Sequence, residues 1–198
     1  MKAKLDTLSN IEKIRQSISK LANLPAEEWA FYSELLEEVT FKKRAYLTPL
    51  GEIEKYAYFI MEGAVRYVKP TDDKDICVDL GFSGNFVSSF ASCLSQTPSQ
   101  VAIQAVTPVI AMRLNYEPVR QFIESSSQEE RFHRRIAEQL YIRETKRTYS
   151  LISQTAEERY LNLIKNQPDV LSLIPIKDLA SYLGVHPDSL SRIRNKLA

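Results

Sequence analysis

Several polar side chains near the C-terminus share one face of a short helical pattern, at Asp188, Ser189, Ser191, Arg192 and Asn195. An arginine guanidinium can donate two hydrogen bonds to guanine O6 and N7, and an aspartate can accept one from cytosine N4. Short hydroxyls suit phosphate oxygens, as do Lys177, Arg194 and Lys196 at longer range. These residue types therefore favour contact with duplex DNA, although Arg192 could also be an ordinary solvated arginine.

Two short helices must position that face. After Pro175, apolar residues recur at i, i+3, i+4 and i+7, namely Ile176, Leu179, Ala180 and Leu183. The polar residues of this first helix are expected to point outward: Lys177, Asp178 and Ser181. Gly184 can end the helix in a left-handed conformation, and Pro187 suits the first position of the next helix. That second helix is expected to bury Leu190, Ile193 and Leu197.

This segment resembles the helix-turn-helix in the spacing of four residues: the small residue Ala180, the glycine Gly184, and the aliphatic residues Leu190 and Ile193. The resemblance implies that the second helix enters the major groove. The implied DNA-binding residues are Lys177, Pro187, Asp188, Ser189, Ser191, Arg192, Asn195 and Lys196. The alternative is an αα-hairpin that caps a core. His186 is expected to be a helix cap or turn residue.

The composition is that of a soluble globular protein, with 44% hydrophobic and 26% charged residues. No apolar stretch is long enough for a membrane span, and the N-terminus lacks the apolar run of a secretion signal, so a cytoplasmic protein is expected. Residues 131–198 carry twelve Lys or Arg against seven Asp or Glu, while residues 1–130 carry fourteen against eighteen. The basic excess lies with the proposed DNA-contacting helices.

The two cysteines, Cys77 and Cys93, lack partners at metal-binding spacing. We expect buried or half-buried free thiols, with redox sensing as the alternative. An enzyme built on a β-barrel with a metal site would need several histidines inside the barrel. The only histidines, His133 and His186, lie outside the β region, so neither catalysis nor a metal or other cofactor is expected.

Upstream, the pattern predicts helices, then strands, then helices. Asn10 to Leu21 reads as an amphipathic helix capped by Asn10, and Pro25 opens a second helix. From Val39 to about Leu114, short β runs alternate with turn signals, which include Gly51, Gly63, Gly81 and Gly84. Positive φ is expected at three of these glycines: Gly51, Gly63 and Gly84. This region predicts a β-sandwich or barrel.

A short helix is expected at Glu117–Phe122, followed by a long one from Gln128 to about Ser153. The long helix shows one apolar stripe: Phe132, Ile136, Leu140, Thr145 or Lys146, Tyr149 and Ile152. We interpret it as a dimer-forming spine, with a bridging helix inside a monomer as the alternative. Thr155 and Glu158 have the spacing of a capping box that opens the next helix.

Three segments carry a wider resemblance: Leu50–Glu52, Tyr58–Tyr67 and Gly84–Val87. With the long helix and the helix-turn-helix, the chain resembles the Crp/Fnr superfamily of bacterial transcription regulators. The resemblance implies an α+β fold: an N-terminal double-stranded β-helix (jelly roll) resembling a cyclic nucleotide-binding domain at 1–127, a dimerisation helix at 128–153 and a helix-turn-helix domain at 154–198. It also implies homodimers on palindromic double-stranded DNA and contacts with RNA polymerase.

Two departures from the family pattern affect the expected function. The positions that match the family's nucleotide-binding residues are occupied by Ser88-Ser89 and Ser99-Gln100. The arginine that contacts the cyclic phosphate in the family is absent from these positions, so cyclic AMP is not expected to bind tightly. Another small-molecule effector remains open, with the candidate pocket residues Gly84, Phe86, Ser88, Ser89, Ser99 and Gln100. Only Ala198 follows Leu197, so the family's β wing and its phosphate contacts are expected to be missing. Pro187 also stands where the family has an arginine at the start of its DNA-contacting helix. The competing function is a sensor or protein-interaction module that does not bind DNA.

Overall fold

The computed structural model describes residues 2–19, 24–125 and 127–197. Within these residues, eight strands form two four-stranded antiparallel sheets. One sheet has the order β1 (Leu36–Phe41), β8 (Val109–Asn115), β3 (Tyr56–Glu62) and β6 (Phe86–Val87). The other has the order β2 (Tyr46–Thr48), β7 (Ala102–Ala105), β4 (Ala64–Pro70) and β5 (Asp75–Phe82). The sandwich confirms the predicted jelly roll, called the roll below. The short helix α3 (Phe90–Ser95) connects β6 to β7.

Alternating side chains of the strands divide the core into an interior and an outer face. In β3, Tyr58 and Ile60 pack inside the sandwich with Val65 and Ile103 from the opposite sheet. Phe59, between them in sequence, instead joins a cluster with the N-terminal helices. This is the period of two that a strand with both faces covered requires. The roll therefore has an apolar interior and a second apolar surface that only helices can cover.

Glycines act in two different ways in the roll. Positive φ occurs as predicted at three of them: Gly51, Gly63 and Gly84. The prediction of a turn at Gly81 was wrong, because Gly81 lies within β5. A Cβ atom there would come within 2.8 Å of the Val65 side chain and 2.7 Å of the Val87 side chain. Close packing inside the sandwich, rather than a turn, explains this glycine.

Four helices cover the outer face of the first sheet: α1 (Lys2–Ser19), α2 (Ala26–Glu34), α4 (Tyr116–Ser125) and α5 (Ser127–Ser153). Pro25 precedes α2 as predicted. The prediction that Asn10 caps a helix was wrong, since Asn10 lies within α1 and its amide donates to a Glu38 carboxylate oxygen over 3.4 Å. Leu21, which was assigned to the same helix, lies outside the described residues. Among the described residues, no helix is both long and apolar enough to cross a bilayer.

The long helix α5 has two distinct apolar faces rather than one stripe. Phe132 is buried and Ile136 packs with the N-terminal helices, whereas Tyr149 and Ile152 are 63% and 79% exposed. The prediction of a single stripe was wrong because its residues are spaced by four on average, and such a spacing drifts around a helix. At 3.6 residues per turn, Tyr149 lies about 100° around the axis from Phe132. The inner face packs on the roll, and the outer face is uncovered.

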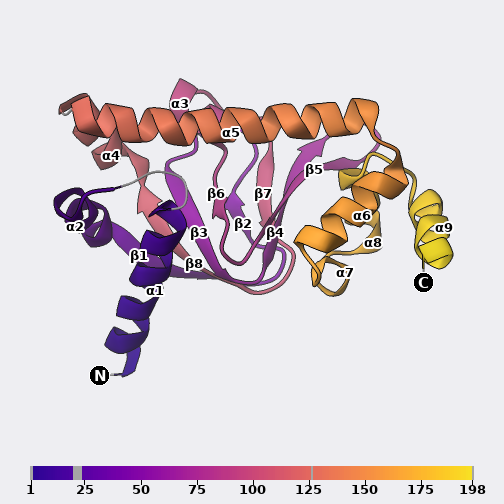
Figure 1. Cartoon of the computed structure of the whole chain (residues 1–198), viewed down its shortest axis with the longest axis horizontal. Coiled ribbons are helices and arrows are strands. Elements are labelled where there is room, and N and C mark those ends of the chain that lie inside the picture. Colours follow the sequence, from indigo (N-terminus) through magenta and orange to yellow (C-terminus); the bar gives the residue numbers. More distant parts are fainter. Residues whose placement is uncertain (1, 20–23, 126, 198) are drawn as a thin grey trace.

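The C-terminal part contains α6 (Ala156–Asn166), α7 (Val170–Leu173), α8 (Ile176–Tyr182) and α9 (Pro187–Leu197). A capping box opens α6 as predicted, since Thr155 and Glu158 exchange both side chain to backbone hydrogen bonds. Figure 1 shows α5 running along the roll and leading into these helices, with α9 at the end of the molecule opposite α1. The C-terminal helices and the outer face of β4 and β5 share one apolar cluster.

Candidate functional site

The pair α8 and α9 has the close packing of a helix-turn-helix. Ala180 is fully buried, which lets the two helices approach, and Leu190 of α9 is fully buried against the same cluster. Gly184 has a φ of +70° between them, as predicted, and the Val185 N–H donates to the Ala180 carbonyl over 3.0 Å. Leu197 does not join the core as expected, since it is 40% exposed near the end of α9.

The outer face of α9 presents most of the predicted DNA-binding side chains to solvent: Asp188, Ser189, Ser191, Arg192, Asn195 and Lys196. Lys177 of α8 is also exposed, whereas Pro187 is half-buried at the start of α9. Three of these side chains already have partners, and the Asp188 carboxylate lies 3.4 Å from Nδ1 of the His186 ring. The Ser191 hydroxyl donates to the Pro187 carbonyl over 3.0 Å, and the Lys196 ammonium pairs with the Glu157 carboxylate at 2.7 Å. The Arg192 guanidinium makes no hydrogen bond or ion pair within the part of the chain that the structure describes.

The opposite side of α8 docks on the edge of the roll, and the prediction that Asp178 and Ser181 point outward was wrong. Asp178 is 8% exposed and forms an ion pair with Arg66 of β4. The Ser181 hydroxyl accepts a hydrogen bond of 2.8 Å from the Cys77 N–H of β5. Because β5 is the last strand of its sheet, its outer N–H groups need partners from elsewhere. Helix α8 therefore covers a sheet edge, and both of its faces are in use.

Two arginines fix the junction between the long helix and α8. Arg147 of α5 donates to the carbonyls of Val78 and Tyr182 over 2.7 and 3.1 Å, and lies 3.9 Å from the Tyr182 ring centroid. Arg159 of α6 donates to the Leu183 carbonyl over 3.0 and 2.8 Å. Carbonyls near the end of a helix lack partners within the helix, so these guanidinium groups satisfy them. The position of the helix-turn-helix is thus tied to both α5 and β5.

The residues that were predicted to line an effector pocket do not lie together in the structure. Ser88, Ser89 and Ser99 are buried together, with 2.7 Å between the Ser89 and Ser99 hydroxyl oxygens. Each hydroxyl has a partner within the chain, because Ser88 donates to the Tyr56 carbonyl and Ser99 to the Val101 carbonyl. Two other candidates, Gly84 and Gln100, are exposed.

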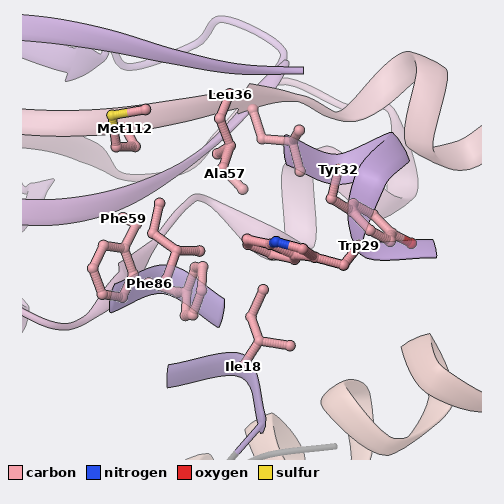
Figure 2. A pocket seen from close by; sticks show the side chains of 10 residues that line it. Ile18, Trp29, Tyr32, Leu36, Ala57, Phe59, Phe86 and Met112 are labelled. Atoms are coloured by element: carbon pink, nitrogen blue, oxygen red, sulfur yellow. The ribbon is translucent and has the colours of Figure 1, made fainter. Parts of the chain in front are cut away.

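Phe86 faces away from these serines. Its ring packs edge to face against Phe59 with centroids 4.9 Å apart, and it lines a cavity of about 40 Å³ between α1, α2 and the outer face of the first sheet. Figure 2 shows this cavity with Trp29 and Ile18 opposite Phe59 and Phe86. The volume is far below the roughly 300–1,000 Å³ typical of small-molecule pockets. Phe86 therefore has a packing role, which separates it from the proposed effector site.

Near the serines, a residue that sequence reasoning missed holds a buried negative group. Glu54, just before β3, is 3% exposed, and its carboxylate accepts hydrogen bonds from the N–H groups of Lys55 and Tyr56, each at 2.9 Å. It also accepts from the Thr48 hydroxyl and, over 3.4 Å, from the Ser89 N–H. Burial and the charge of Glu54 raise the pKa of Tyr58. A charged residue in a turn-like segment gives no sequence signal of burial.

The arginines of the β region that seemed available to a ligand are engaged elsewhere. Arg66 also donates to the Gln104 side-chain carbonyl over 3.1 and 2.8 Å, besides its pair with Asp178. Arg113 pairs with Glu37 at 2.9 Å and lies over the Tyr56 ring. Neither guanidinium replaces the missing phosphate-binding arginine.

Both cysteines are buried free thiols, as expected. Burial raises the pKa of the Cys77 and Cys93 thiols to about 12, with nearby carboxylates as a second cause. Because the thiolate is the reactive form, these thiols are poor nucleophiles. The observation weakens the alternative of redox sensing.

Comparisons with known proteins match this arrangement. Residues 38–126 match the family described as the cyclic nucleotide-binding domain. FixK2 from Bradyrhizobium japonicum shares 20% identity and a TM-score of 0.66, over 82% of this chain and 84% of that one. A Crp/Fnr-family protein from Eubacterium rectale shares 15% identity and a TM-score of 0.64, over 86% and 82%. The catabolite activator protein of Thermus thermophilus shares 16% identity and a TM-score of 0.56, over 91% and 86%.

The chain has the Crp/Fnr fold. No curated protein matches its sequence. The Crp/Fnr fold accounts for the order of roll, long helix and C-terminal helix-turn-helix that the sequence predicted.

Proposed function

We propose that this chain is a homodimeric transcription regulator that binds a specific sequence in double-stranded DNA through α9. The observation that carries the proposal is the outer face of α9. Arg192 has no partner among the described residues, and Asp188 and Asn195 are exposed beside it on a helix held rigidly by Leu190 and Gly184. The Crp/Fnr fold supports the same function, since its structural relatives include proteins named as regulators or activators.

In this proposal Arg192 donates hydrogen bonds to guanine and Asp188 accepts one from cytosine, while Ser189 and Lys177 contact phosphates. Lys196 contributes less than its charge suggests, because its ammonium pairs with Glu157. A regulator of this kind also needs to act on transcription, and we carry RNA polymerase over from the family as the expected partner.

The exposed outer face of α5 supports the homodimer. Tyr141, Tyr149 and Ile152 are 74%, 63% and 79% exposed, and Ile142 is 42% exposed beside them. Ile142, Tyr149 and Ile152 follow the seven-then-three spacing of a coiled-coil seam. A second copy of α5 would remove this apolar surface from water. Two copies then present two α9 helices, which suits a palindromic operator with one half-site for each.

The roll does not bind cyclic AMP tightly in this proposal. An anionic phosphate buried without a cationic partner loses a charge-assisted bidentate contact. The nearby arginines, Arg66 and Arg113, are held by Asp178 and Glu37.

An Arg192→Ala variant tests the function. Duplexes are first selected from a random pool with the unmodified chain, and affinities are then measured by fluorescence anisotropy. Loss of a bidentate base contact should weaken binding to the selected duplex by about 1–3 kcal/mol, with little change for unrelated duplexes. Arg131→Ala, at an exposed arginine of α5, is the matched control. If the unmodified chain selects no duplex even at low salt, the proposed DNA binding is contradicted and the alternative of a protein-interaction module is favoured.

An Ile152→Asp variant tests the homodimer by analytical ultracentrifugation. A buried Ile side chain stabilises by about 1.5–3 kcal/mol, and twofold symmetry makes the loss occur twice, so the dissociation constant should increase by at least about a hundredfold. Leu171→Asp, at an exposed leucine of α7, should leave the association unchanged. A single-chain mass for the unmodified protein at micromolar concentration would contradict the homodimer.

A further inference from the structure

The buried carboxylate of Glu54 already uses its full capacity to accept hydrogen bonds. One oxygen accepts from the N–H groups of Lys55 and Tyr56, and the other from the Thr48 hydroxyl and the Ser89 N–H. An ionised carboxylate has about four acceptor positions, so all are occupied. A glutamate is rarely fully buried without a partner, and here donors from three separate chain segments replace water. The surrounding groups form an anion-binding site.

The rest of this site is also satisfied internally. The Glu54 N–H donates to the Ser92 hydroxyl oxygen over 3.0 Å, which holds the backbone of the residue itself. Ser89 and Ser99 bond to each other through their hydroxyl groups. Each of these donors has an acceptor within the chain, and the cavity lined by Phe86 lies on the other side of the sheet. An external anion would need to displace the Glu54 carboxylate.

We propose that Glu54 is an internal ligand of the roll. Its carboxylate occupies an anion site formed by Thr48, Lys55, Tyr56 and Ser89, and thereby closes the site to external anions. The inference deepens the proposal that cyclic AMP is not bound tightly, but it concerns the roll alone and does not depend on DNA binding. The class of ligand that fits the site is a small carboxylate, because a carboxylate is what the donors hold.

The size of the missing group defines the probe. A Glu54→Ala substitution removes one methylene and the carboxylate, which together correspond to acetate. It also leaves four donors without their acceptor. Acetate should therefore bind the variant and stabilise its folded state, whereas chloride offers no paired oxygens. Melting temperatures are compared at pH 7 in sodium acetate and sodium chloride of equal ionic strength, with circular dichroism as the readout.

Glu54→Ala should melt at a lower temperature than the unmodified chain in chloride, and acetate should raise its melting temperature by a further increment. At ten times its dissociation constant, a ligand shifts the unfolding equilibrium about tenfold, or about 3–6 °C for a chain of this size. The general effect of acetate is measured on the unmodified chain and on Glu52→Ala, which removes an exposed carboxylate two residues away. Glu54→Gln should be destabilised but not rescued, because its amide fills the space.

The proposal is overturned if acetate raises the melting temperature of Glu54→Ala no more than that of Glu52→Ala. It is also overturned if Glu54→Gln gains as much as Glu54→Ala, which would indicate a nonspecific salt effect. Should Glu54→Ala be unfolded in chloride, folding in acetate supports the proposal, and failure to fold in either salt contradicts it. Since the readout is thermal, loss of DNA binding cannot imitate any of these results.

Discussion

The ion pair between Arg66 and Asp178 joins the roll to the helix-turn-helix, so breaking it should loosen the two parts from each other. The side chains are 22% and 11% exposed, which places the pair between a surface bridge and a buried one. Replacing Asp178 by Asn keeps the shape and removes the charge. Replacing Arg66 by Gln removes the cation, which also contacts the Gln104 side chain.

The expected loss of stability follows from how exposed the two side chains of the ion pair are. Exposed pairs couple by about 0.2–1 kcal/mol, whereas removing one partner of a fully buried pair costs about 3–5 kcal/mol. The Gln104 carbonyl stays bonded to Arg66 when Asp178 is changed, so part of the arginine remains satisfied. We therefore expect Asp178→Asn to destabilise by about 2 kcal/mol, with a coupling free energy of about 1–2 kcal/mol between the two sites.

A double-mutant cycle measures this coupling by urea unfolding of the unmodified chain, both single variants and the double variant. The pair Arg113 and Glu37 gives a matched control, because its side chains are 33% and 64% exposed. The double-mutant cycle of this control pair should give a coupling free energy of less than about 1 kcal/mol. A coupling between Arg66 and Asp178 no larger than in this control would refute the assignment of the pair as a link between the roll and the helix-turn-helix.

Three further predictions follow from burial and pairing. Because the pKa of the Cys77 and Cys93 thiols is raised to about 12, their thiolate fraction at pH 8 should be about one in ten thousand. Ellman's reagent should therefore label the native chain far more slowly than the unfolded chain. Burial lowers the pKa of His133 to about 4, so the unfolded chain takes up a proton below about pH 6.5 while the folded chain does not. Stability should fall by about 3 kcal/mol from pH 6.5 to pH 4, and a His133→Gln variant measured by urea unfolding should lose this decrease. Lys196→Ala should change affinity for the selected duplex less than Lys177→Ala, since only Lys196 is paired with Glu157 in the free chain; anisotropy titrations giving the reverse order would contradict this.

Much of the fold could be predicted because its signals are local. The positive φ of Gly63, the capping box at Thr155 and the turn at Gly184 each depend on neighbours a few residues away. The alternation of strand residues likewise needs no distant information. The single stripe assigned to α5 failed for a geometric reason, since residues spaced by four on average do not stay on one face over five turns.

The candidate site could be predicted only where its residues face solvent. The exposed positions of Asp188 and Arg192 follow from the helical period of α9, and the structure agrees. Asp178 and Glu54 were missed because charged residues are normally assigned to the surface. Their partners come from distant positions, as with Arg66, which is 112 residues from Asp178 in the sequence. A single sequence contains no local signal for such pairs.

The observed docking of the helix-turn-helix on the roll and the proposed association of two chains involve opposite faces of α5. The inner face carries Arg143, which pairs with Asp79 of β5, and Arg147, which bonds to the Val78 carbonyl. The apolar side chains at Tyr149 and Ile152 point to solvent instead. A second copy can therefore cover the outer face without breaking any contact between α5 and β5. The outer face of α9 is also free of these contacts, so the docked arrangement is compatible with both a homodimer and bound DNA.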